Sequence, residues 1–301
     1  MSMPYLVKAG DVLVSDIGQS PKGKLAVSPN HPEDTYQDNE SRPRQSTNSE
    51  RKQTTTWSIA VQSYRYARDF YWGYDTLLIK LPGAMMENIE VEIADLNIMP
   101  LQYAPKETHE HLRNRGETFW KCRKRRLVSY EQERKDGTHA RGVVDFSTYI
   151  ELHPYKQPIM RGSDVSTMVK DLPNGDIPPE APGNHLFPSE IPGLDVRSKK
   201  WIDLKTDRIR DLESEMATDL IGNKGNGLIM LLYGPPGTGK TFTAESVAEI
   251  AKKPLYAVTC GDIGTKPEQV EKYLQSVFYL GKIWNCVVLL DEAEVFLEHA
   301  P

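Results

Sequence analysis

The hydrophobic and polar positions divide the 301-residue chain into four parts. Residues 1–56 are mostly polar, and from residue 19 onward they are crowded with Ser, Pro, Asn, Gln and Lys and nearly lack aromatic residues. Such a composition buries too little apolar surface to offset the entropy of ordering, so it predicts a disordered tail. Residues 57–170 and 205–301 carry the periodic patterns of folded domains. Residues 171–204 between them are rich in proline and glycine, which predicts a linker.

The first periodic part predicts an α+β domain. Residues 57–66, 76–81, 89–93 and 143–150 have the alternation or the β-branched and aromatic content of strands. Apolar residues between them recur near helical spacing and predict one long amphipathic helix over residues 107–131. No motif in this part indicates a chemistry.

The second periodic part alternates strands and helices. The predicted elements are a helix around residues 209–220, a strand at 228–233, a helix at 240–252, a strand at 255–259, a helix at 267–280 and a strand at 286–290. This alternation predicts an α/β domain whose parallel sheet is sandwiched by helices. Thr265 and Glu268 have the spacing of a capping box, and Gly281 stands where a helix is expected to end.

Composition excludes some classes of protein. The formal net charge is −5, with both signs mixed, so nothing favours binding to nucleic acid or to an acidic membrane. The three cysteines are scattered, which argues against a disulfide framework or a zinc site. The N-terminus lacks a signal-peptide pattern, and no apolar segment approaches the ~20 residues of a membrane span. We therefore expect a soluble, intracellular protein.

A glycine-rich stretch follows the strand predicted at residues 228–233. It fits G-x-x-x-x-G-K-[ST] at every constrained position, and the predicted nucleotide-binding residues are Gly234, Pro235, Pro236, Gly237, Thr238, Gly239, Lys240, Thr241 and Phe242. Glycines let the backbone curl so that N–H groups converge on a β-phosphate at the start of the next helix. We expect Lys240 to reach the β- and γ-phosphates and Thr241 to bind Mg²⁺. Because a strand precedes the loop and a helix follows it, an incidental glycine turn is the weaker interpretation.

Two acids complete the predicted site. Asp291 and Glu292 end an apolar strand, 51 residues (291 − 240) beyond Lys240. Asp291 is expected to hold Mg²⁺, largely through water, and Glu292 to orient or deprotonate the attacking water. Lys240 and Glu292 are thus the predicted catalytic residues. Alone, such an acidic pair is usually a solvated strand end. Here it is interpreted as part of a site because it accompanies the glycine-rich loop, which we call the P-loop.

The two motifs resemble those of AAA-family ATPases: Gly-Pro-Pro-Gly-Thr-Gly-Lys-Thr, then Thr243-Ala-Glu, then Leu-Leu-Asp-Glu-Ala-Glu. The sequences of residues 227–234, 254–265 and 284–297 are similar to those of a group of AAA ATPases common in filamentous fungi. That group carries a large N-terminal region of unknown function. The resemblance implies ATP and Mg²⁺ as cofactors and a hexameric homo-oligomer. It also implies hydrolysis of ATP to ADP and phosphate that remodels an unknown protein partner.

The chain also departs from the family's pattern. It ends nine residues (301 − 292) after Glu292, so no positions match the family's sensor asparagine, arginine finger or helical lid, and an incomplete, truncated core is expected. Loss of an arginine finger alone costs ~10³–10⁵ in rate. Residues 260–265 contain no aromatic residue, unlike the pore of protein-threading relatives.

Three alternatives to an ATPase that remodels a protein partner stay open. The chain could be a switch that binds ATP without turnover, or an inactive fragment with an exposed sheet edge. A nucleic-acid translocase is the weakest of the three. The basic run at residues 121–126 is interpreted as a solvated helix face, ahead of a nuclear-import or phosphate-binding patch. The aromatic group at residues 64–74 is interpreted as core, ahead of a surface that stacks nucleobases.

Overall fold

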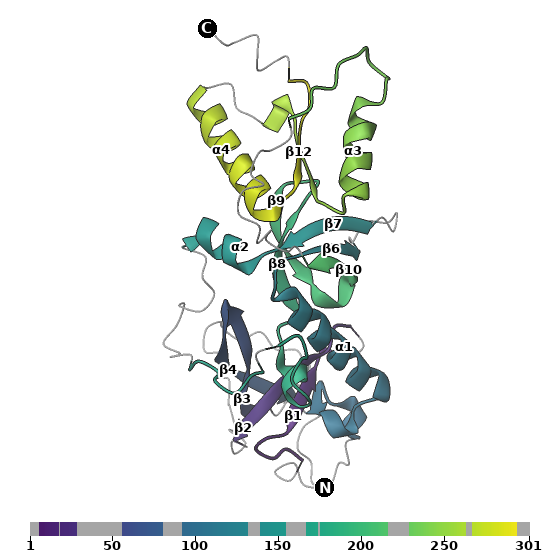
Figure 1. Ribbon diagram of the computed structural model, residues 1–301. Coiled ribbons are helices and arrows are strands. Elements are labelled where there is room, and N and C mark those ends of the chain that lie inside the picture. Colours follow the sequence, from purple (N-terminus) through teal and green to yellow (C-terminus); the bar gives the residue numbers. More distant parts are fainter. Residues whose placement is uncertain are drawn as a thin grey trace, which may run out of the picture. The chain divides into compact units, whose positions relative to one another are not determined.

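The structure is a computed structural model that describes residues 6–17, 19–28, 56–80, 92–131, 139–154, 167–173, 175–215, 229–262 and 267–293. The chain forms two compact units (Figure 1). Unit 1 comprises residues 1–121, 150–191 and 205–207, and unit 2 comprises residues 122–149, 192–204 and 208–301. Each unit is therefore assembled from segments that lie far apart in the sequence.

Unit 1 is built on a five-stranded antiparallel sheet in the order β4-β3-β2-β1-β5. Its strands are β1 (Val12–Ser15), β2 (Lys22–Ser28), β3 (Thr56–Ala67), β4 (Asp69–Lys80) and β5 (Ile98–Pro100). Strands β3 and β4 form one long hairpin around Arg68, whose φ of 70° allows the tight reversal. Trp57, Ile59 and Val61 alternate along β3 and point into the core, as the period of a half-buried strand requires.

Helix α1 (Lys106–Cys122) contributes a second, aromatic part of the unit 1 core. Phe119 stacks on Phe187 with ring centroids 5.4 Å apart, and Trp120 stacks on Phe70 at 5.7 Å. Tyr64 joins the same group at 5.4 Å from Phe187. Tyr64 and Phe70, both from the predicted aromatic group, are thus core residues. The short 3-10 helices are η2 (Ile93–Asp95), η3 (Leu101–Tyr103), η5 (Gly183–Leu186), η6 (Thr206–Arg208) and η7 (Cys260–Asp262).

Unit 2 contains a second antiparallel sheet in the order β10-β6-β7-β8-β9. Its strands are β6 (Arg126–Glu131), β7 (His139–Val144), β8 (Glu190–Asp195), β9 (Lys200–Lys205) and β10 (Ile209–Glu215), and helix α2 (Phe146–Leu152) follows β7. Leu127, Val143 and Leu194 of this sheet are buried in the core that also contains Trp284. The antiparallel sheet is therefore part of the same packed unit as the C-terminal segment.

The C-terminal segment has the βα alternation that the sequence predicts. It comprises α3 (Lys240–Ile250), β11 (Leu255–Val258), α4 (Pro267–Trp284) and β12 (Val287–Leu290). Strands β11 and β12 are parallel, with Leu255 opposite Val287 and Val258 opposite Leu290. Figure 1 shows α3 and α4 on opposite sides of this pair. The helices at 240–252 and 267–280 and the strands at 255–259 and 286–290 are confirmed.

Three expectations for this segment fail in the described residues. Gly281 lies inside α4, which continues to Trp284. The parallel sheet consists of only two strands among the residues described. Residues 229–233 form no strand, because no described strand pairs with them, and all but Leu232 are exposed, with Ile229 at 95% and Tyr233 at 97%. Thr265 of the predicted capping box lies outside the described residues.

The polar N-terminal part contains more structure than its composition predicts. The prediction of disorder was wrong for β1 and β2, because β1 pairs with β2 and β5, β2 pairs with β1 and β3, and Leu13 and Ala26 are buried in the core. Residues 29–55 of the predicted tail lie outside the described part. Residues 89–91 of one predicted strand also lie outside it, and Ile93 begins a 3-10 helix.

Four further elements differ from the sequence pattern. The predicted helix 107–131 ends at Cys122, and its last six residues form strand β6. The predicted strand 143–150 is the end of β7 followed by α2. The predicted helix at 209–220 begins as strand β10 instead. The predicted linker contains β8 and most of β9, because long-range sheet pairing supplies partners that local proline and glycine content does not reveal.

Among the helices of the described part, none is long and apolar enough to cross a membrane.

Candidate functional site

The glycine-rich loop lies directly before α3. Gly237 and Gly239 have φ values of 80° and 81°, in the left-handed region that glycine occupies without a steric penalty. Gly239 is also the N-cap of α3, so the helix begins immediately after the last glycine. The free N–H groups of a helix N-terminus and its partial positive charge favour an anion at this place. The loop therefore has the backbone that phosphate binding requires.

Lys240 folds back over the loop. Its Nζ donates hydrogen bonds to the backbone oxygens of Gly234 at 2.7 Å and Pro235 at 3.0 Å. The Thr238 hydroxyl donates to the same Pro235 oxygen at 2.9 Å, which closes the loop from inside. The ammonium group of Lys240 is consequently held at the loop, where phosphate oxygens can replace the two carbonyl oxygens as its hydrogen-bond acceptors.

Thr241 and Asp291 bring the two predicted motifs together. Thr241 Oγ1 lies 3.4 Å from Asp291 Oδ2, although 50 residues separate them in the sequence. Asp291 N donates to the backbone oxygen of Val258 at 2.8 Å, so the ladder between β11 and β12 continues to the residue that faces the P-loop helix. A hydroxyl and a carboxylate are hard oxygen ligands of the kind that Mg²⁺ prefers. These two side chains therefore fit an Mg²⁺ ion, bound directly or through its waters.

Glu292 occupies the turn that follows. Its N–H donates to Asp291 Oδ1 at 3.2 Å, and its φ of 54° is uncommon for a residue with a side chain. Glu292 is exposed, whereas Asp291 is partly buried. Such backbone conformations are concentrated at functional sites, where surrounding structure holds them.

The remaining predicted residue, Phe242, lies in the first turn of α3 and is 72% exposed. The structure therefore places Lys240, Thr241, Asp291 and Glu292 at one end of the βα segment, and it leaves the Phe242 ring facing solvent.

Sequence reasoning missed how the antiparallel sheet of unit 2 holds this segment. Arg141 of β7 makes a bidentate ion pair with Glu249 near the end of α3, at 2.7 and 3.0 Å. These hydrogen bonds lower the pKa of Glu249. Lys199, in the turn between β8 and β9, pairs with Asp262 just after β11. Desolvation raises the pKa of Asp262, but hydrogen bonds from Lys199 and Thr259 outweigh it and leave the pKa lowered.

A third connection involves Arg125, within the basic run that was interpreted as a solvated face. Its side chain is only 23% exposed and is paired with the buried carboxylate of Asp145. The interpretation was therefore wrong for this residue. A local signal existed for Asp145, because an Asp three residues before Thr148 at the start of a helix is the pattern of an N-cap.

Comparison with known proteins agrees with this geometry. Residues 230–300 match the family described as "ATPase family associated with various cellular activities (AAA)". Residues 230–300 are thus similar to AAA ATPases, and we call them the AAA segment. The AAA segment contains the P-loop from its first glycine, both helices, both parallel strands and the acidic pair.

Curated relatives match stretches of the chain that differ widely in length. The chain is 37% identical over 70 residues to an ATPase-like fidgetin of Schizosaccharomyces pombe, which covers 23% of this chain and 11% of that protein. It is 35% identical over 75 residues to the vacuolar protein sorting-associated protein 4 of Dictyostelium discoideum, covering 24% and 17%. A longer match, 24% identical over 253 residues, is to a Lon protease of Mycoplasma genitalium, covering 79% and 27%.

The chain thus spans between 11% and 27% of the length of these three relatives. No solved structure matches the chain.

Proposed function

We propose that this chain binds Mg·ATP at its P-loop and takes part in Mg²⁺-dependent hydrolysis of ATP to ADP and phosphate. The observation that carries the proposal is the 3.4 Å approach of Thr241 Oγ1 to Asp291 Oδ2. A P-loop threonine and a strand-end aspartate at this separation are the two protein groups that P-loop ATPases use to hold the metal. The match of residues 230–300 to the AAA family supports the same activity.

Each residue has a distinct role in the proposed reaction. The loop N–H groups from Gly237 to Thr241 and the N-terminus of α3 bind the β-phosphate, and Lys240 neutralises the β- and γ-phosphates. Thr241 and Asp291 hold Mg²⁺, which when bound neutralises charge on the phosphate oxygens. Glu292 orients the attacking water or takes its proton.

The biological role is proposed from the relatives. The relatives that match include an ATPase-like fidgetin, a vacuolar protein sorting-associated protein and Lon proteases. We infer that hydrolysis drives remodelling of a protein partner, and that the complete assembly is a homo-oligomer, hexameric by analogy with the family.

Titration of a fluorescent ATP analogue with Mg²⁺ tests the binding step. Lys240→Ala removes two or three charge-assisted hydrogen bonds to phosphate, so we expect affinity to fall about 10- to 100-fold. Lys272→Ala, which removes an exposed lysine from α4, is the matched control and should bind like the parent chain. Equal affinity of the parent and the Lys240→Ala protein would refute the proposed site.

Phosphate release from the same samples tests the chemical step. Glu292→Gln retains the size and shape of the side chain but removes the general base, so turnover should fall by roughly 10²- to 10⁴-fold while binding persists. Binding without phosphate release by the parent chain would favour a nucleotide-dependent switch. No binding by any variant would assign the activity to a longer protein that contains this segment.

A further inference from the structure

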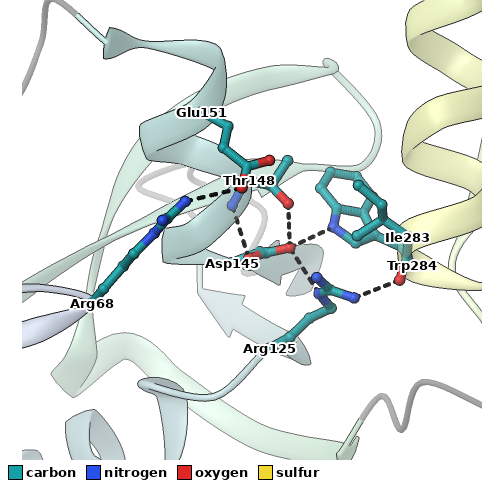
Figure 2. Close-up of polar contacts among 7 residues, drawn as sticks. All are labelled: Arg68, Arg125, Asp145, Thr148, Glu151, Ile283 and Trp284. Atoms are coloured by element: carbon teal, nitrogen blue, oxygen red, sulfur yellow. Dashed lines mark hydrogen bonds and ion pairs between the residues drawn. The ribbon is translucent and has the colours of Figure 1, made fainter. Parts of the chain in front are cut away.

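A buried carboxylate outside the nucleotide site connects the antiparallel sheet of unit 2 to α4. Asp145 follows β7 and is 3% exposed. It caps α2, because its Oδ1 accepts from Thr148 N at 3.1 Å and its Oδ2 accepts from Thr148 Oγ1 at 2.6 Å. Figure 2 shows that the same carboxylate is turned toward the end of α4.

Two further donors reach Asp145 Oδ2 from different elements. Trp284 Nε1, on the last residue of α4, donates at 2.9 Å, and Arg125 Nε, just before β6, donates at 2.8 Å (Figure 2). Arg125 Nη1 also donates to the backbone oxygen of Ile283 at 2.5 Å. Backbone oxygens in the last turn of a helix lack partners within the helix, so this bond fixes the helix terminus itself. Two consecutive residues at the end of α4 are thus held by one ion pair of the sheet.

The end of α4 determines where the metal-binding strand begins. Asn285, with φ of 49°, makes the turn, and Cys286 N closes it by donating to Gly281 O at 3.1 Å. Val287 N then donates to Pro254 O at 2.9 Å and starts the pairing of β12 with β11. Strand β12 is only four residues long and leads directly to Asp291. A displacement of Trp284 would therefore be carried along a short, hydrogen-bonded connection to Asp291.

We propose that Asp145 is a positioning residue for the metal side of the nucleotide site. Through Trp284 and Arg125, Asp145 fixes the end of α4 and the start of β12. The antiparallel sheet thereby determines the position of Asp291 relative to Thr241. This inference rests on the proposed function. Partners that orient metal-binding groups from outside the site change metal affinity or activity by 10–100-fold when they are removed.

The effect should appear in the Mg²⁺ dependence of ATP binding. Without Mg²⁺, affinity depends on the P-loop and Lys240; with Mg²⁺, it also depends on Asp291 and Thr241. Asp145→Asn keeps the shape but removes the charge facing Arg125, and Trp284→Phe keeps an aromatic ring but removes the Nε1 donor. For both variants we expect the increase in affinity on adding Mg²⁺ to fall roughly tenfold, with binding in EDTA unchanged.

Glu131→Gln is the matched control. This substitution converts a carboxylate of the same sheet to its amide. It weakens the 2.7 Å ion pair between Glu131 of β6 and Arg210 of β10, in which both side chains are about half exposed. We expect no change in the affinity for ATP, either with Mg²⁺ or in EDTA. An unchanged Mg²⁺ effect in both test variants would overturn the proposal, as would equal losses with and without Mg²⁺ accompanied by lower thermal stability.

Hydrogen exchange of the nucleotide-free chain separates failure of this inference from failure of the proposed function. We expect faster exchange of the Val287–Leu290 amides in Trp284→Phe, while amides of the β3–β4 hairpin in unit 1 keep their parent rates. If the parent chain binds no ATP, the proposed function fails, and exchange still decides whether Trp284 holds β12. Unchanged exchange in β12 would refute the positioning role whatever the nucleotide data show.

Discussion

At the scale of single residues, burial determines the ionisation of the Cys286 thiol, just before β12. Cys286 lies between α4 and β12, and desolvation raises the pKa of its thiol to about 11, although a backbone hydrogen bond and Lys253 oppose the shift. Only the thiolate is a nucleophile, so a raised pKa suppresses its reactivity throughout the neutral range. This cysteine is a packing residue of the unit 2 core.

Alkylation kinetics test this ionisation. At pH 8 a thiol of pKa about 11 is about 100-fold less ionised than the same thiol at its ordinary value of 9.0. We therefore expect iodoacetamide to label Cys286 at least about 100-fold more slowly in the native chain than in guanidinium, measured by mass spectrometry of its peptide. Comparable rates in the two states would show that the thiol is not buried.

At the scale of elements, close approach of backbones sets which residues a helix accepts. Gly116 lies in α1, and a Cβ at this position would stand 2.0 Å from the backbone oxygen of Asn184. Helix propensity alone would favour alanine by about 1 kcal/mol. The clash involves backbone, which cannot rotate away as a side chain can, so packing outweighs propensity here.

A pair of alanine substitutions in α1 separates these two effects. Gly116→Ala should destabilise unit 1 by about 1–3 kcal/mol, because overpacking costs more than the gain in propensity. Asn114→Ala, at an exposed position of the same helix, gains propensity without a clash and should stabilise it by up to about 0.7 kcal/mol. Urea denaturation followed by circular dichroism measures both. A stabilised Gly116→Ala protein would contradict the packing of α1 against η5.

The sequence pattern also predicted helices at two places where the structure has strands. Leu127 and Tyr130 are spaced as on a helix face, yet they lie in β6, where Val128 is buried as well. Spacings of three residues fit one helical turn, but a strand buried on both faces produces them too. Similarly, Ile209 and Leu212 belong to β10. Pairing with strands distant in the sequence decided both cases.

At the scale of the whole molecule, the AAA segment shares its core with residues from before the predicted linker and from within it. Leu127, Val143 and Leu194 pack in the same cluster as Val277 and Trp284. Ion pairs of the antiparallel sheet also reach α3 and the end of β11. The compact unit that the structure forms also contains residues 122–149 and 192–204, which the predicted domain at residues 205–301 omits.

Expression of residues 205–301 alone tests this organisation. The fragment lacks β6, β7 and β8, and would expose the apolar face of α4, so we expect no cooperative thermal transition by circular dichroism and no binding of a fluorescent ATP analogue. The full chain, measured in parallel, should unfold cooperatively. A fragment that unfolds cooperatively and binds the analogue would show that the antiparallel sheet is dispensable.

The sequence by itself determined the glycine-rich loop, the helix that follows it, the two parallel strands and the acidic pair, because each depends on local spacing, and the loop depends also on glycines at positive φ. It also predicted that Thr241 and Asp291 share a metal site, which their 3.4 Å separation supports. Only the tertiary structure decided that residues 229–233 form no strand, that β2 forms in a polar tail, and that Asp145 holds α4. Each of these depends on whether a partner distant in the sequence is present, and local patterns carry no information about that.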